Sequence, residues 1–170
     1  MIRGQLDGLS RRTAALWKAG LTLVLSALTA VLQTVLAVEI LGMHATNPVS
    51  LALFSALGSA AVGMITLFCL LAFDVAGRII AVLVMLLFGV PTSGGPYPEQ
   101  TLPRFFRFLG DWLPLRRMTD GARSLVFFDG RMGAGLAPAL WVLGAYLVGF
   151  TLLVLLFGRQ LERRALRQNA

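Results

Sequence analysis

Uncharged polar side chains within an apolar run are the residues of this sequence best placed to do chemistry. They lie at spacings of four, three and four residues, which puts them on one face of a helix: Thr22, Ser26, Thr29 and Gln33. Because lipid disfavours hydroxyl and amide groups, we expect this polar stripe to face other helices, where it either packs by hydrogen bonding or lines a route for a substrate. In the next apolar run Ser55, Ser59 and Gly63 form a ridge of small residues suited to close packing.

The remaining reactive residue types predict no enzyme. His44 is the only histidine, and no Ser, Cys or carboxylate is placed to act with it. Cys69 is the only cysteine, which excludes an intramolecular disulfide and a thiolate metal cluster. We expect Glu39, near the end of the first apolar run, to reach the membrane interface or pair with an arginine rather than transfer protons. We therefore predict no catalytic residue, no cofactor and no metal ion.

Composition indicates a lipid environment for these residues. Of the 170 residues, 57% are hydrophobic and 14% are charged, whereas soluble domains carry about 25% charged residues. The net charge of +7 comes from Lys and Arg that cluster at the ends of the apolar runs. Cytoplasmic segments of membrane proteins concentrate these residues beside anionic lipid. The predicted partner is therefore the lipid bilayer, and no nucleic acid is expected.

The predicted fold is an all-α membrane protein with four transmembrane helices. We place these at about 17–41, 49–73, 79–91 and 136–157, since about 20 apolar residues cross the ~30 Å hydrocarbon layer. The third is short, because Pro91 to Pro96 interrupt it. Residues 1–18 form a cytoplasmic segment, 19–157 a single transmembrane domain and 158–170 a basic cytoplasmic tail. Nine of the 15 Lys and Arg flank the predicted inner ends, which places both termini in the cytoplasm and the chain in the cell (plasma) membrane.

The outer segment, 92–133, predicts two short amphipathic helices before the last span. Apolar side chains recur at helical spacing in each, with charged residues on the other faces. Burying a charge at the bilayer centre costs about 2.5–3.5 kcal/mol, so neither helix can span the membrane. The pair is either a simple interfacial anchor or a shallow re-entrant element that closes the outer end of a pathway. The candidate gate or interface residues are Phe105, Phe106, Trp112, Arg104, Arg107, Arg116 and Arg117.

Two stretches carry a family resemblance: FDVAGR at 73–78 and PTSGGPYPEQTLPRFFRFLGDWLPLRRMTDGARSLVFFDGR at 91–131. They resemble the end of ABC type-2 permeases, most closely the phage-infection-protein (YhgE/Pip) branch and the related group containing nitrosoguanidine-resistance membrane proteins. Such permeases have six transmembrane helices, with paired outer re-entrant helices before the last. The resemblance implies that the four spans here correspond to the last four. The first helix and large outer domain of the phage-infection-protein branch have no counterpart.

The resemblance implies a permease-like subunit that takes part in export of amphipathic or lipid-like substrates. The sequence holds no G-x-x-x-x-G-K-[ST] motif, so a separate ATPase would supply the energy. By the resemblance, that ATPase would contact the stretch from Ser10 to Lys18, with Arg11 and Arg12 as candidates. A homo-oligomer or a second membrane chain is expected. The alternatives are a non-transporting scaffold or accessory subunit of a secretion system, and a truncated permease fragment.

Overall fold

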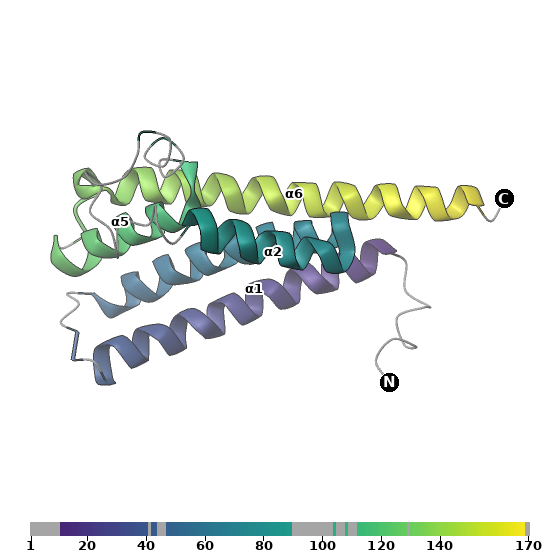
Figure 1. Cartoon of the computed structure of the whole chain (residues 1–170). Helices are drawn as coiled ribbons and strands as arrows, with labels where there is room; N and C mark the ends of the chain where they lie inside the picture. The colour runs from purple at the N-terminus through teal and green to yellow at the C-terminus, as the bar shows by residue number, and fades with distance from the viewer. Residues whose placement is uncertain are drawn as a thin grey trace.

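A computed structural model describes residues 11–40, 42–43, 47–89, 104, 108, 112–128 and 130–168. Every regular element in these ranges is helical (Figure 1). The α-helices are α1 (Arg11–Val35), α2 (Pro48–Val84), α5 (Pro114–Phe127) and α6 (Leu136–Gln168). Short turns of other helical types extend or precede them: η2 (Leu36–Ile40), η3 (Met85–Gly89) and η5 (Met132–Ala134).

Three segments are long and apolar enough to cross a membrane: Thr13–Ile40, Pro48–Phe73 and Leu136–Gly158. They correspond to the first, second and last spans predicted from the sequence. The described residues are therefore all-helical, and three of their helices are long and apolar enough for a multi-pass membrane protein. The residues predicted as the remaining span, 79–91, belong to the end of α2 and to η3 as far as Gly89, and beyond it they lie outside the described residues.

Local signals explain where these helices begin. Asn47 precedes α2, and its side-chain oxygen accepts a hydrogen bond of 3.2 Å from the backbone N–H of Ser50. Pro48 and Pro114 open α2 and α5, positions where a missing N–H costs nothing. Gly130 and Gly135 have φ values of 72° and 104°, which a glycine adopts without strain. They lie where the chain turns from α5 into α6.

Helix α2 reverses direction within its own length. A Cβ atom added at Gly77 would collide with the backbone carbonyl of Cys69. In a straight helix eight residues rise by about 12 Å, so this contact requires the helix to fold back between them. The secondary structure stays helical through 74–78, where the sequence predicts a loop. Figure 1 shows the teal end of α2 running back toward the end of the bundle where α2 began.

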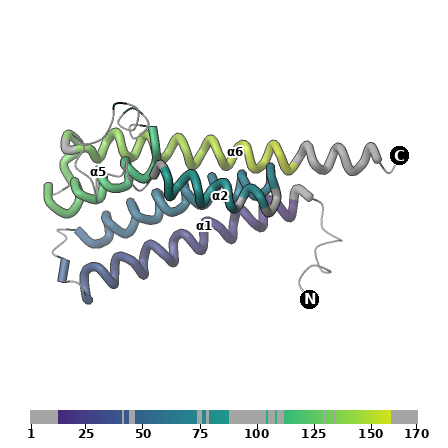
Figure 2. The backbone as a smooth tube through the Cα atoms, viewed as in Figure 1, coloured from purple at the N-terminus to yellow at the C-terminus, as the bar shows by residue number. Residues whose placement is uncertain are grey.

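The helices pack around two groups of buried residues, one toward each end of the bundle. The first joins α2, α5 and α6 through Leu51, Phe54, Ala61, Leu125, Leu136, Ala139 and Leu143. The second joins α1, α2 and α6 through Ala19, Met64, Leu67 and Val154. In Figure 2, α1 begins and the coloured part of α6 ends at one end of the bundle, whereas α5 and the start of α2 lie at the other. The helix order therefore places α5 at the end opposite the start of α1.

Candidate functional site

Small side chains let α1 approach α2 closely. The buried residues of α1 recur at spacings of four or seven positions, which keeps them on one face, and are Ala15, Ala19, Ser26, Ala30 and Thr34. On the α2 side, a Cβ atom at Gly63 would lie 2.7 Å from Thr22 Cγ2 and 3.4 Å from Ser26 Oγ. Small residues at such crossings are the usual way in which helices associate within membranes. The ridge predicted around Gly63 is therefore a contact surface for α1.

An open groove of about 470 Å³ lies where α1, α2 and α5 meet. Hydroxyl groups line it on two sides: Thr22, Ser26 and Thr29 from α1, and Ser59 from α2. The other lining residues are apolar: Leu25, Val62, Gly63, Leu115 and Met118. We call this the hydroxyl groove. None of its lining side chains is charged, so it offers hydrogen bonding within an apolar surface.

Two threonine hydroxyls of the groove are bonded within their own helix. Thr22 Oγ1 donates to the carbonyl of Lys18 at 2.8 Å, and Thr29 Oγ1 donates to that of Leu25 at 2.7 Å. A threonine hydroxyl has one donor and two acceptor lone pairs, so each oxygen remains able to accept a hydrogen bond. The groove therefore presents hydrogen-bond acceptors while the threonine hydroxyls keep their hydrogen bonds within α1. It holds no nucleophile paired with a base, and no group of three or more metal-binding side chains occurs among the described residues.

The predicted polar stripe is only partly brought together. Ser26 is buried, Thr22 is half-buried, and Thr29 is exposed but lines the groove, whereas Gln33 is exposed and lies outside the groove. Thr29 and Gln33 each precede a buried residue, Ala30 or Thr34, by one position, which is about 100° around the helix. The stripe thus follows the edge of the buried face rather than its centre, and Gln33 is not covered by the described helices of this chain.

Sequence reasoning missed Thr34, a buried hydroxyl residue near the end of α1. Thr34 is 7% exposed and donates its hydroxyl to the carbonyl of Ala30 at 2.9 Å. Its spacing of four from Ala30 and eight from Ser26 is the signal that identifies it. Ser59 was expected to pack closely, and the structure instead places it at the wall of the groove.

The outer segment is fixed to the bundle by a tyrosine. Tyr146 of α6 donates a hydrogen bond of 2.8 Å to the backbone carbonyl of Trp112, just before α5 begins. The Tyr146 ring also stacks on Phe150, with ring centroids 5.9 Å apart. The hydroxyl partner that Tyr146 needs in an apolar helix is thus the outer segment. The Trp112 side chain is exposed.

Helix α5 is amphipathic. Leu125 is buried, and Met118, Ala122 and Val126 pack against the same core. On the other side Asp120 Oδ2 lies 3.8 Å from Arg116 Nε and 3.9 Å from a guanidinium nitrogen of Arg117. Part of the positive charge of the outer segment is therefore balanced within α5 itself.

Several candidates predicted from the sequence fall where less is described. Phe105, Phe106, Arg107 and His44 lie outside the described residues, and Arg104 is exposed. Arg11 and Arg12 form the first turn of α1, and their side chains are outside the description. Glu39 is exposed in η2, and Cys69 is half-buried in α2. The roles predicted for these arginines and phenylalanines remain predictions.

No family model, curated protein or solved structure matches this chain.

Proposed function

We propose that the chain is a subunit of an ABC type-2 permease-like exporter, which moves amphipathic or lipid-like molecules outward with energy from a separate ATPase. The hydroxyl groove is the observation that carries this proposal. Its walls combine apolar surface with uncharged hydrogen-bond acceptors. That combination suits a molecule with an acyl portion and a polar portion better than it suits an ion.

The remaining elements have roles in such an exporter. The helix beyond the reversal of α2 is a fourth, shortened span, and the two short helices of the outer segment form a shallow re-entrant pair. Both termini are cytoplasmic, which places Arg11 and Arg12 where an ATPase can contact them. The hydrogen bond from Tyr146 to Trp112 supports this arrangement, because it holds the outer segment against a membrane-spanning helix.

The groove is open, so the described residues of one chain do not enclose a route through the membrane. The proposal therefore includes a second copy or another membrane chain that covers it. The exposed side of α1 offers a surface for such a partner, with large apolar side chains at Leu25, Leu28 and Leu32.

Transport by the complex purified from native membranes and reconstituted in vesicles tests the proposal. Thr29→Val and Ser59→Ala remove hydroxyls from the groove with little change of shape. We expect each to lower ATP-dependent export of a fluorescent phospholipid analogue about fivefold or more, since a lost hydrogen bond to substrate is worth about 1 kcal/mol.

Thr151→Val is the matched control for this experiment. Thr151 makes the same kind of bond on α6, to the carbonyl of Leu147 at 2.6 Å, and does not line the groove. It should leave export unchanged. A complex that contains no ATPase, or groove variants that export as well as the unmodified chain, would contradict the proposal. A stable membrane complex without flux would instead support the non-transporting scaffold.

A further inference from the structure

One nine-residue pattern occurs twice in the chain, on different helices. Leu-Trp-x-x-Gly-x-x-Leu-Val runs from Leu16 to Val24 in α1 and from Leu140 to Val148 in α6, 124 positions later. Each copy lies near the beginning of its helix. Because α1 and α6 begin at opposite ends of the bundle, the copies also lie at opposite ends (Figure 1).

Each copy forms an open groove on the outward surface of its helix. The α1 groove has a volume of about 540 Å³ and is lined by Thr13, Leu16, Trp17, Gly20, Leu21 and Val24. The α6 groove has a volume of about 610 Å³ and is lined by Ala137, Leu140, Trp141, Gly144, Ala145, Val148 and Met132. Apart from Met132, every lining residue of one groove has its equivalent in the other. The repeat is therefore structural as well as sequential.

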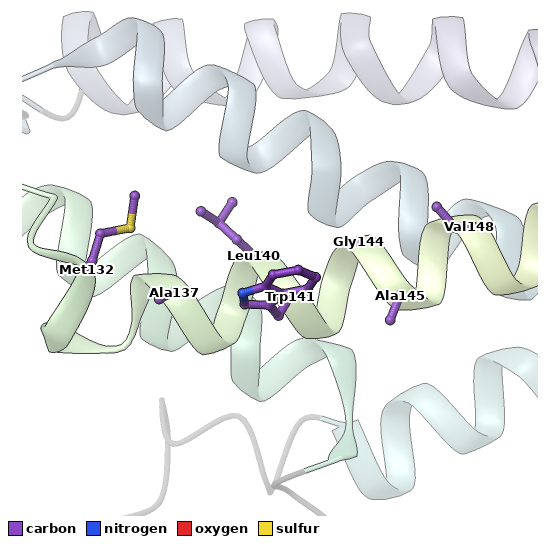
Figure 3. A pocket seen from close by; sticks show the side chains of 7 residues that line it. All are labelled: Met132, Ala137, Leu140, Trp141, Gly144, Ala145 and Val148. Atoms are coloured by element: carbon purple, nitrogen blue, oxygen red, sulfur yellow. The ribbon is translucent and has the colours of Figure 1, made fainter.

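Within each groove the glycine and the tryptophan have matching surroundings. A Cβ atom at Gly20 or at Gly144 would meet nothing within 4 Å, so both glycines form an open floor. Trp17 is 70% exposed and Trp141 is 81% exposed. Figure 3 shows the Trp141 ring lying against the outward side of α6, with Met132 toward one end of the groove and Val148 toward the other.

The depth of the tryptophans corresponds to the membrane interface. Trp17 lies four residues into the span that begins at Thr13, and Trp141 five residues into the span that begins at Leu136. These offsets are about 6 and 8 Å along the helix axis. Indole rings favour this level, where the ring contacts acyl chains and the N–H meets the headgroups. From each tryptophan the groove runs about 10 Å deeper, to Val24 or Val148, within one leaflet of the ~30 Å core.

A cationic side chain lies close in sequence to each groove, and a long Lys or Arg side chain can extend its charged end to the headgroups. Lys18 follows Trp17 and is exposed. Arg131 directly precedes Met132, and its side chain is exposed. The Arg131 backbone is held in place: buried Ser124 donates its hydroxyl to the Arg131 carbonyl at 3.0 Å, and the Arg131 N–H donates to Phe128 O at 3.0 Å. The grooves thus combine an acyl-chain surface, an indole N–H and a nearby positive charge, which are the features that the parts of an anionic phospholipid can contact.

We propose that the repeated pattern forms two equivalent sites for an anionic phospholipid, one in each leaflet. One acyl chain lies over Gly20 or Gly144, and the phosphate group lies near Lys18 or Arg131. The charge complementarity favours an anionic lipid over a second copy of the chain. This inference is independent of transport, because it concerns the outward surfaces of α1 and α6 rather than the hydroxyl groove.

Native mass spectrometry of the purified chain, titrated with phosphatidylglycerol or phosphatidylcholine, tests the proposal by counting bound lipids. We expect two tightly bound phosphatidylglycerol molecules on the unmodified chain. Gly20→Leu and Gly144→Leu fill the groove floors, and each should remove one bound lipid. Ala27→Leu on the exposed surface of α1 and Gly149→Leu on α6 add similar volume outside these grooves and should leave both lipids bound.

Charge variants test the headgroup separately. Lys18→Gln and Arg131→Gln should each lower the preference for phosphatidylglycerol at one site about fivefold, which corresponds to ~1 kcal/mol per cation near an anionic surface. Lipid counts that the leucine variants leave unchanged would overturn the proposal. The proposal would also be overturned if the unmodified chain were a dimer and the leucine variants dissociated it without losing lipid. The grooves would then be contacts between two copies of the chain. If the unmodified chain retained phosphatidylglycerol and phosphatidylcholine equally, a preference for an anionic headgroup would be excluded.

Discussion

At the scale of single residues, Gly63 sets the distance between α1 and α2. A methyl group there would lie 2.7 Å from Thr22 Cγ2, closer than side chains tolerate. We expect Gly63→Ala to push the helices apart and lower the free energy of unfolding by about 1–3 kcal/mol, the usual cost of overpacking. Thermal unfolding in detergent would show this as a lower midpoint.

Gly20→Ala is the control for that experiment, because a Cβ atom at Gly20 meets nothing within 4 Å. It should leave the midpoint unchanged or raise it slightly, since alanine favours the helix by about 1 kcal/mol over glycine. Equal midpoints for Gly63→Ala and Gly20→Ala would show that α1 and α2 do not approach as closely as described.

Residue spacing alone predicted part of this contact. The four-residue spacing of Ser55, Ser59 and Gly63 indicates a packing ridge, and Gly63 does face α1. A tyrosine hydroxyl in an apolar helix needs a hydrogen-bond partner, but the sequence does not show that the partner of Tyr146 is the Trp112 carbonyl 34 residues away. Such a partner depends on how two elements pack, which a periodic pattern within one element does not encode.

At the scale of elements, the reversal of α2 is the least familiar feature. Leu53 and Leu87 are both exposed, near the start of α2 and in η3. In a straight helix they would lie about 51 Å apart. Because α2 folds back, we expect spin labels at these positions to give less than half that distance in pulsed electron resonance. A distance near 50 Å would show that α2 is straight.

Gly77 provides a variant that should disturb this reversal. A side chain there meets the Cys69 backbone, which cannot move aside as a flexible side chain can. Gly77→Ala should therefore lengthen or broaden the Leu53–Leu87 distance distribution. Gly149→Ala, where a Cβ atom meets nothing within 4 Å, should leave the distribution unchanged.

The ends of α1 and α6 differ from the ends of the apolar runs. The first run was predicted to begin at about residue 17, but α1 begins at Arg11. Apolar runs mark the hydrocarbon layer, whereas backbone hydrogen bonding continues into the headgroup region, where arginine is tolerated. The same holds for α6, which extends to Gln168 beyond the predicted span. The apolar runs 49–73 and 79–91 predict a break between two helices at FDVAGR, while the close approach at Gly77 that makes the reversal sharp is a tertiary contact.

At the scale of the whole molecule, the hydroxyl groove could be predicted only in part. Thr22, Ser26 and Thr29 were identified from their spacing, but Leu115 and Met118 of α5 complete the groove from a segment more than 80 residues away. Their contribution depends on α5 lying back along the bundle. That position follows from its packing on α2 and α6, including the contact of Gly121 with Phe54.

The arrangement of the helices makes a prediction about the two sides of the membrane. Met43, after α1, and Met132, before α6, are both exposed and belong to the end of the bundle opposite the start of α1. Single cysteines at these positions, in a Cys69→Ser background, should react with a membrane-impermeant maleimide in intact cells. A cysteine in place of Gln168, at the end of α6, should react only after lysis.

The pattern of labelling separates the orientation of the protein in the membrane from the arrangement of its helices. The orientation is expected from the distribution of positive charge, and the arrangement depends on the order of the helices. Reversed labelling of all three cysteines would invert the orientation expected from the charge distribution and leave the bundle intact. Labelling of Met43→Cys and Met132→Cys from different sides of the membrane would contradict the helix arrangement itself. The start of α2 and the start of α6 would then lie on opposite faces of the membrane, and α5 could not pack against both, as its buried Leu125 requires.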